Sequence, residues 1–315
     1  MFDAFNITGL ITPKEPELFK PRRKDCNSLS SYGDPSLNTN IVPETQFTFA
    51  NFKYKSRYNR DDALVYLNLS SYLFFKQAFN AFPVSSCVKL RFFEKELKII
   101  IDQSPIHSFT VTMKKELFET YKIASDDIML SVSSRGIIHA MNNIKQVDAF
   151  MRLYYFHEGS DVVIDVYGSG MFTTHIPTFS NRDFMLVGNI QSDKIFDMTC
   201  KPKLLSLILS ETDSKVKAIA FQLSSECFEV IFSTHELTKL YNIPYESSFI
   251  KKVTFLETIK FQYPLEPLLK IRKALSLGDS LNFSILENGL LNILIIIENN
   301  DGPMSCFELF VVPLV

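Results

Sequence analysis

One repeated pattern constrains the fold of this chain more than any other feature: a strand, a short amphipathic helix and three further strands. The pattern is clearest at the C-terminal end, where Ile259–Tyr263 is a β-branched and aromatic run. Pro264 follows at a position suited to the first turn of a helix, and leucines then recur at helical spacing as far as Leu275. Turns at Asn288-Gly289 and Asn300-Asp301-Gly302 separate the three extended segments, which are Leu281–Leu286, Leu290–Glu298 and Cys306–Val312.

The chain contains this βαβββ pattern four times, with helices expected to begin at Ser70, Ser133, Lys201 and Pro264. The first and third starts lie 131 residues apart, as do the second and fourth. Equal spacing over so long a period is typical of a duplicated domain rather than of a solenoid. Tight turns between most strands predict antiparallel sheets with the helices on one face, which is an α+β fold. The expected divisions are an irregular N-terminal extension at 1–62, domains at 63–177 and 194–315, and a connector at 178–193.

The other expected strands follow from β-branched and aromatic runs with alternating polarity. They are Leu64–Leu67, Val88–Phe93, Leu97–Asp102, His107–Lys114, Ile128–Val132, Phe150–Phe156, Val162–Val166, Met171–Ile176, Ile195–Thr199, Val216–Gln222, Phe228–Phe232 and Leu237–Tyr241.

Prolines punctuate the N-terminal extension, which has little periodicity and is expected to be dispensable for the fold. Its basic cluster Pro21-Arg22-Arg23-Lys24 is either a solvated charge run or a nuclear-import signal. Gln46–Tyr54 alternates aromatic with polar residues and is expected to form a strand.

Composition excludes several classes of protein. The five cysteines are scattered without a CxxC pair, which indicates reduced thiols in a cytosolic or nuclear protein. The net charge is −2, so any surface for nucleic acid must be local. The longest apolar runs, such as Leu291–Ile297, have the length of a strand and are too short to span a membrane.

Catalytic motifs are missing from the sequence. The five histidines are far apart and show no metal-binding spacing, and no nucleophile-elbow or P-loop motif occurs. Asp126-Asp127 precedes a strand and is expected to be loop charge. We therefore expect no enzymatic activity, no metal and no cofactor.

The expected helices each pair an apolar face with a narrow polar stripe that carries basic residues. A single stripe of this kind is usually only a solvated face, but four on one side of duplicated sheets would add into a basic surface suited to phosphates. The residues expected on this surface are Lys76, Arg135, Lys145, Lys201, Lys203, Lys270 and Lys273.

Three stretches carry a resemblance to the DNA sliding clamps related to proliferating cell nuclear antigen. Leu67–Phe79 resembles the strand that leads into a channel helix, and Phe109–Ile123 resembles the stretch before the second helix. The tail Glu298–Leu314 is similar to the closing strands of the "one" subunit of the nine-one-one DNA-damage checkpoint clamp. The N-terminal extension departs from the cellular clamps.

The resemblance implies a ring of three subunits that encircles double-stranded DNA, with helices lining the channel and sheets outside. It places the subunit interfaces on two edge strands, made by Met171, Phe172, Thr173, Thr174, His175 and Ile176 in the first domain and Leu237, Thr238, Lys239, Leu240 and Tyr241 in the second. It also places a groove for partner peptides at Phe184, Met185, Leu186, Val187, Pro313, Leu314 and Val315.

The partners implied are two further clamp subunits, a clamp loader, and DNA polymerase or repair and checkpoint proteins in the nucleus. A checkpoint heterotrimer is the first interpretation. A homotrimeric replicative processivity factor, cellular or viral, is the second, and an α+β scaffold without a DNA role is the third.

Overall fold

The structure is a computed structural model that describes residues 58–69, 72–81, 87–142, 149–168, 170–179, 192–234, 236–299 and 302–314. The chain divides into two compact units, Met1–Lys55 and Ser56–Val315, and only the second contains described residues. The basic cluster at 21–24, the expected strand Gln46–Tyr54 and the connector residues 180–191 lie outside the described part.

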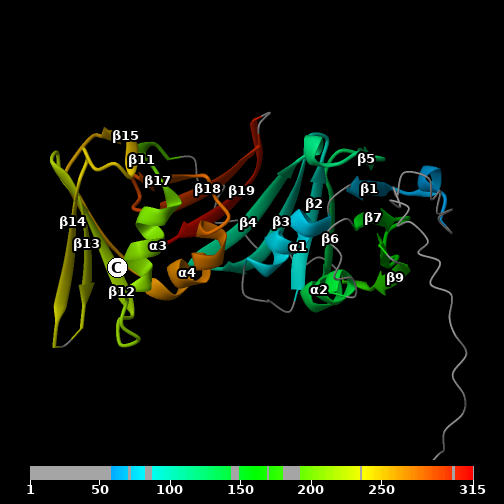
Figure 1. The fold of residues 1–315 in the computed structure, drawn as a ribbon, viewed down its shortest axis with the longest axis horizontal. Helices are drawn as coiled ribbons and strands as arrows, with labels where there is room; N and C mark the ends of the chain where they lie inside the picture. Colours follow the sequence, from blue (N-terminus) through cyan, green and yellow to red (C-terminus); the bar gives the residue numbers. More distant parts are fainter. Residues whose placement is uncertain are drawn as a thin grey trace, which may run out of the picture. The chain divides into compact units, whose positions relative to one another are not determined.

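The first half of the described unit contains two βαβββ units (Figure 1). Its elements are η2 (Arg60–Asp62), β1 (Val65–Leu69), α1 (Tyr72–Asn80), β2 (Cys87–Phe93), β3 (Glu96–Ser104), β4 (His107–Lys114), η3 (Lys115–Leu117), β5 (Thr120–Ile123), β6 (Ile128–Ser133), α2 (Ser134–Asn142), β7 (Phe150–Tyr155), β8 (Val162–Tyr167), β9 (Met171–Ile176) and β10 (Thr178–Phe179).

The second half repeats this arrangement. Its elements are β11 (Lys194–Cys200), α3 (Pro202–Ser210), β12 (Ala218–Leu223), β13 (Cys227–Ser233), β14 (Thr238–Pro244), β15 (Ile250–Phe255), β16 (Ile259–Pro264), α4 (Leu265–Lys270), α5 (Arg272–Leu275), β17 (Ser280–Leu286), β18 (Leu291–Asn299) and β19 (Gly302–Val311).

Strand pairing repeats as closely as strand order does. The order β5-β1-β7-β8-β9 in the first half matches β15-β11-β17-β18-β19 in the second, and β6-β2-β3-β4 matches β16-β12-β13-β14. All of these pairs are antiparallel. The predicted α+β class and duplicated βαβββ units are therefore confirmed.

The helices of each half pack on the sheets of that half. Along each strand, every second side chain points toward the helices. Phe75 of α1 and Ile137 of α2 are fully buried, as are Leu209 of α3 and Ala274 of α5. Removing a side chain of leucine or phenylalanine size from water contributes about 1.5–3 kcal/mol, so this buried face holds the short helices in place.

A single ladder joins the two halves. β4 pairs antiparallel with β19 over seven residue pairs, from Ser305 opposite Met113 to Val311 opposite His107. Because β4 and β19 are each an outer strand of their own half, this pairing makes one sheet continuous across the chain.

Three expectations need correction. The fourth helix is not continuous: Ile271, with ψ near −1°, ends α4 before α5 begins. Leu237 lies in a turn before β14, because Thr234 Oγ1 accepts the backbone N–H groups of Glu236 and Leu237. The sequence pattern also omits β5 and β15. The four residues of β5 are all half-buried, so they show no alternation, and pairing with β1 defines the strand.

Two glycines with positive φ offer a matched test of packing near the C-terminus. Gly289 has φ +78°, and a Cβ there would lie 2.7 Å from Phe261 Cε1 and 3.0 Å from Pro313 Cγ. Gly159 has φ +77° and no atom within 4 Å of that position. Gly159→Ala should cost about 1–2 kcal/mol of backbone strain. Gly289→Ala should cost about 1–3 kcal/mol more because of overpacking. Both variants are compared with the unaltered chain by denaturant unfolding. Equal losses of unfolding free energy would show that the packing around Gly289 is loose.

Candidate nucleic-acid interface

Of the two predicted cations that the structure describes on the helices of the first half, one is exposed and one is half-buried. Lys76 on α1 is half-buried, and its Nζ donates a hydrogen bond of 3.5 Å to the carbonyl of Met141 at the end of α2. Arg135 is exposed in the first turn of α2. Lys145 lies outside the described residues. Lys76 therefore contributes to the packing of α1 against α2. Among the described lysines and arginines of these two helices, Arg135 is the one whose exposed side chain can meet an anion.

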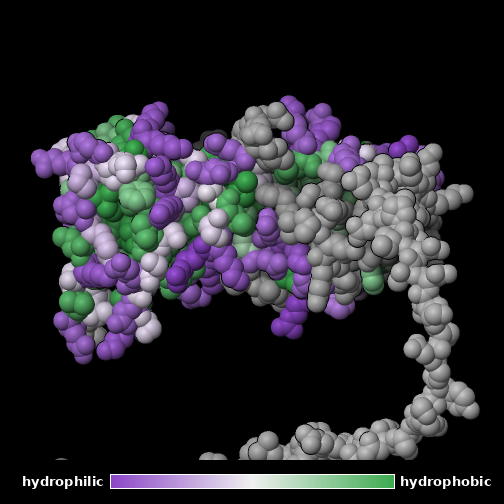
Figure 2. Space-filling model, in the orientation of Figure 1, coloured by the Kyte–Doolittle hydropathy of each residue, from purple (hydrophilic) through white to green (hydrophobic). Residues whose placement is uncertain are grey.

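The second half carries a denser group of cations. Lys201 is the exposed N-cap residue of α3, and Lys203 is exposed two residues later. On α4, the half-buried Lys270 forms an ion pair with Glu266, with Nζ and Oε1 3.2 Å apart. Lys273 is exposed on α5. In Figure 2, hydrophilic side chains gather over α4.

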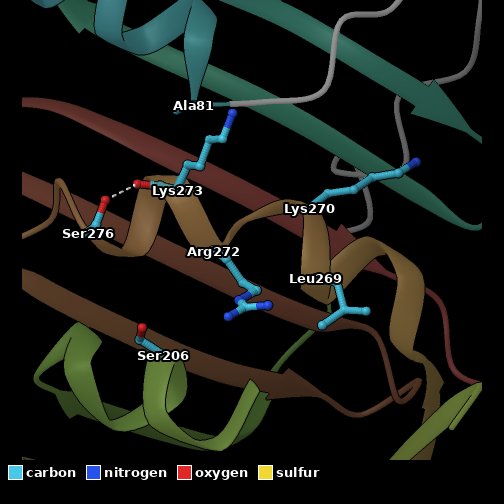
Figure 3. A pocket seen from close by; sticks show the side chains of 7 residues that line it. All are labelled: Ala81, Ser206, Leu269, Lys270, Arg272, Lys273 and Ser276. Carbon is cyan, nitrogen blue, oxygen red and sulfur yellow. Dashed lines mark hydrogen bonds between the residues drawn. The ribbon is translucent and has the colours of Figure 1, made fainter. Parts of the chain in front are cut away.

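A pocket of about 540 Å³ brings part of this group together. Figure 3 shows Arg272 extending toward α3 and Lys273 extending toward Ala81 at the end of α1. The pocket is lined by Ala81, Ser206, Leu269, Lys270, Arg272, Lys273 and Ser276.

The lining of this pocket suits an anion. Arg272 and Lys273 are exposed and form no hydrogen bond or ion pair through their side chains with the part of the chain that the structure describes. The hydroxyl of Ser276 donates to the carbonyl of Lys273 at 2.7 Å, which closes the end of α5. Planar guanidinium and mobile ammonium groups beside hydroxyls are the donors that phosphate oxygens accept from.

Sequence reasoning missed Arg272, and the reason is the helix break. In a continuous helix Arg272 lies two residues from Lys270 and away from its stripe. The turn at Ile271 changes the direction of the chain, so Lys270, Arg272 and Lys273 all line one pocket. The only signal in the sequence is the composition of Lys270–Lys273, with three cations in four residues.

Six strands stand at the ends of sheets within the described residues, and β9 and β14 are two of them. β9 pairs with β8, and β14 pairs with β13. Exposed apolar side chains occur along both edges: Phe172 is 44% exposed, Leu240 is 55% exposed, and Leu237 next to β14 is 66% exposed. Unpaired edges with apolar side chains attract further strands, so these two are candidate interfaces.

A cluster of three polar side chains fixes β14 to the end of α3. Glu211 Oε2 accepts hydrogen bonds from Lys239 Nζ at 2.7 Å and from the Tyr241 hydroxyl at 2.9 Å. These bonds, with that of Lys239 first, hold the pKa of Glu211 below its usual value of 4.5. The same bond raises the pKa of Lys239.

A buried carboxylate fixes β9 in the same way. Asp165 on β8 is fully buried and accepts hydrogen bonds from Thr173 Oγ1 on β9 at 2.7 Å and from the Tyr167 hydroxyl at 3.2 Å. Arg152 Nη1 donates to the Tyr167 hydroxyl at 3.2 Å, and the Phe150 ring stacks on Tyr167 at 4.4 Å. The edge strand is thus held by side chains as well as by its ladder.

The predicted partner-peptide groove lies only partly within the described residues. Pro313 is half-buried beside Gly289, and the Leu314 backbone N–H donates to the carbonyl of Gln262 at 2.7 Å, with 47% of Leu314 exposed. Phe184, Met185, Leu186, Val187 and Val315 lie outside the described residues. The groove stays a prediction.

Metal sites and membrane spans have no candidate in the described part of the chain. No group of three or more histidine, cysteine, aspartate or glutamate side chains among the described residues could hold a metal ion. No helix in that same part is long and apolar enough to cross a membrane.

The arrangement of sheets and helices is that of the DNA clamp fold, and solved structures confirm it. Proliferating cellular nuclear antigen from Entamoeba histolytica is similar with a TM-score of 0.67 and 9% identity, over 80% of this chain and 100% of that one. The PCNA2–PCNA3 complex from Sulfolobus tokodaii is similar with a TM-score of 0.66 and 14% identity, over 79% of this chain and 98% of the matched chain. No family model and no curated protein matches the sequence.

The Glu211 cluster gives a prediction for β14. Because the folded pKa of Glu211 is depressed, its stabilising effect is present above pH 4.5 and is lost as the pH falls through the lowered value. Glu211→Gln should weaken both hydrogen bonds and raise hydrogen exchange of the backbone amides of Thr238–Tyr241 at neutral pH. Glu236→Gln removes an exposed carboxylate paired with Lys215 instead and should leave these amides unchanged. Equal exchange in both variants would contradict the role given to Glu211.

Proposed function

We propose that this chain is a non-catalytic subunit of a ring-shaped DNA sliding clamp. The observation that carries the proposal is the clamp fold, with a sheet-end strand in each half, β9 and β14, that is paired on one side only within the described residues. Edge strands of this kind join subunits, and a closed ring removes both edges. The ring would hold duplex DNA by enclosing it.

The basic residues on the helices would face the enclosed DNA. Arg135, Lys203, Arg272 and Lys273 are exposed and can approach phosphates. Contacts of this kind do not distinguish one base pair from another, and salt weakens them. A clamp that moves along DNA needs such contacts, because tight and specific ones would stop it.

The ring would serve as a tether for enzymes. A clamp loader would place it on DNA, and a polymerase or repair and checkpoint proteins would bind the groove that includes Pro313 and Leu314. Tethering raises the local concentration of an enzyme at its substrate without any chemistry by the clamp. DNA as the ligand makes the nucleus the expected location, or a viral replication site if the chain is virus-encoded.

Two types of ring fit the proposed clamp function. The resemblance of the tail Glu298–Leu314 favours a checkpoint heterotrimer with two other clamp subunits. A homotrimeric processivity factor is the second type, and it would use the same two edges, β9 and β14, on each chain.

Retention on circular DNA tests the clamp function. The assembled ring, loaded on a nicked circular duplex by a clamp loader, should stay bound through a high-salt wash. Cutting the circle once should release it, since a ring can slide off a free end. Salt-resistant binding that survives linearisation would contradict encirclement.

Removing two cations of the pocket should weaken DNA binding without affecting stability. Each phosphate that the protein no longer neutralises makes the negative slope of log K against log salt shallower by about 0.9, so Arg272→Ala with Lys273→Ala should reduce its magnitude by about 2 for each subunit that touches the duplex. Stability should change by less than about 0.5 kcal/mol, because both side chains are exposed. The measurement is duplex binding across a salt series.

The control removes two lysines from the edge strands β5 and β15, of which Lys122 also forms an ion pair with Asp61. Lys122 on β5 lies opposite Tyr66 on β1, and Lys252 on β15 lies opposite Thr199 on β11. Lys122→Ala with Lys252→Ala changes the net charge equally and should leave the salt slope unchanged. Equal loss of binding from both double variants would mean that only the net charge of the protein matters.

A further inference from the structure

The end of α5 carries an exposed serine at the rim of the basic pocket. Ser276 follows Arg272 and Lys273 in the sequence Arg-Lys-Ala-Leu-Ser, and all three of these polar side chains are exposed. Its hydroxyl donates to the carbonyl of Lys273 at 2.7 Å, and its backbone N–H donates to the same carbonyl at 3.2 Å. Figure 3 shows this hydroxyl beside Lys273, so a group attached to it would enter the pocket.

The chain that follows Ser276 is fixed against β18. Gly278 lies so close to this strand that a Cβ there would be 2.3 Å from Ile295 Cγ2. The backbone N–H of Asp279 donates to the carbonyl of Ile296 at 2.9 Å. Ser276 therefore stays at the pocket, and the exposed side chains of the preceding residues can turn toward it.

The charge of the pocket is not balanced within the described residues. Lys270 forms an ion pair with Glu266, but no carboxylate among those residues pairs with Arg272 or Lys273. A phosphoserine carries a charge of about −1.5 to −2 at neutral pH and has three strong acceptor oxygens. One phosphate at Ser276 would thus match two cations, and a guanidinium can bind it with two parallel hydrogen bonds.

The same two cations give a protein kinase a basis for recognition. Many kinases select serines by the charge of nearby residues, and here both basic residues precede the serine within one turn. α5 has four residues, and a helix this short is marginal by itself, so its end can open locally. Opening has to expose the buried Ala274 and Leu275 for the time of the reaction.

We propose that Ser276 is a phosphorylation site, and that its phosphate group binds Arg272 and Lys273 and so withdraws them from DNA. The inference rests on the proposed function and names a means of regulating the same pocket. A protein kinase would transfer the γ-phosphoryl group of ATP to Ser276 Oγ. The new bond joins Oγ to phosphorus, the bond to the leaving ADP breaks, and the hydroxyl proton passes to a base of the kinase.

Modification leaves the end of α5 closed, because the Lys273 carbonyl loses the hydroxyl of Ser276 but keeps its backbone N–H. In the proposed ring the pocket would face the enclosed DNA, where a kinase could not reach it. Phosphorylation would therefore act on the free subunit and weaken its binding to DNA before loading.

Ser210 provides a matched comparison within the chain. It is the last residue of α3, it is exposed, and its hydroxyl donates to the carbonyl of Leu207 at 2.7 Å, which is the local geometry of Ser276. The four residues before it, Ser206–Leu209, include no lysine or arginine, and Glu211 follows it. The two serines thus differ in the charge around them.

The first experiment tests whether the folded chain is a substrate. The kinase is one that prefers basic residues before serine and that phosphorylates the isolated peptide 268–280 with ATP. Mass spectrometry of the full chain should then find phosphate at Ser276 and none at Ser210. Arg272→Ala with Lys273→Ala should slow the reaction about tenfold or more, and Ser276→Ala should remove it. A folded chain that stays unmodified at Ser276 would overturn the proposal.

The second experiment measures the effect on DNA. The full chain is produced with phosphoserine in place of Ser276, and its duplex binding is measured across a salt series. The magnitude of the salt slope should fall by about 2 for each subunit that touches the duplex, as for Arg272→Ala with Lys273→Ala. Phosphoserine in place of Ser210 should leave the slope unchanged. Equal effects at both positions would overturn the proposal, because only net charge would then matter.

A readout without DNA separates this inference from the clamp function. The second pKa of phosphoserine is about 6, and two neighbouring cations should lower it in a phosphorus NMR titration. Arg272→Ala with Lys273→Ala should restore the usual value. A normal pKa at position 276, with an unmodified ring that linear DNA releases, overturns the inference and leaves the clamp function intact. A lowered pKa in a chain that never encloses DNA supports the phosphate site and contradicts the function.

Discussion

The ladder between β4 and β19 is the interaction on which the rest of the structure depends. Without it, each half would have an unpaired apolar strand and an incomplete sheet. The strands are joined by backbone hydrogen bonds, which form with almost any side chains. The inner face of the ladder is apolar and buried, and it consists of Phe109, Val111, Phe307 and Leu309. The two halves can therefore diverge in sequence and still meet in one geometry. In the proposed ring, the same kind of strand pairing would join one chain to the next.

The sequence predicted a helix or strand well where its hydrophobic pattern was strong. It predicted an element poorly where hydrogen bonds to a neighbouring strand, rather than a pattern of its own, define that element. The strands Met171–Ile176 and His107–Lys114 were predicted with the bounds that the structure shows, because each is a continuous run rich in β-branched and aromatic residues. β5 could not be predicted, since its half-buried residues show no pattern and β1 supplies its hydrogen bonds. The break at Ile271 has no local signal, because leucine spacing continues through it.

The candidate site was less predictable than the fold. Counting basic residues on helices found Lys203 and Lys273, but it could not separate Lys76, whose ammonium group binds the Met141 carbonyl, from residues that face solvent. Arg272 depends on the direction of α5, which tertiary packing sets. The edge tethers, Asp165 with Thr173 and Glu211 with Tyr241, join residues on different elements. Nothing in a single sequence reports such pairs.

The two free edges differ from each other, and this has a geometric consequence. A contact between unlike strands gives every copy in an assembly the same orientation, so the two sides of the assembly are not equivalent. In the proposed ring, the ends of all chains, with Pro313 and Leu314 fixed beside Gly289 and Gln262, would lie on one side. DNA passing through such a ring would meet one face that carries the chain ends and one that does not. The difference between β9 and β14 would thus give the ring two unlike faces, and a protein that binds the chain ends would stand on one of them.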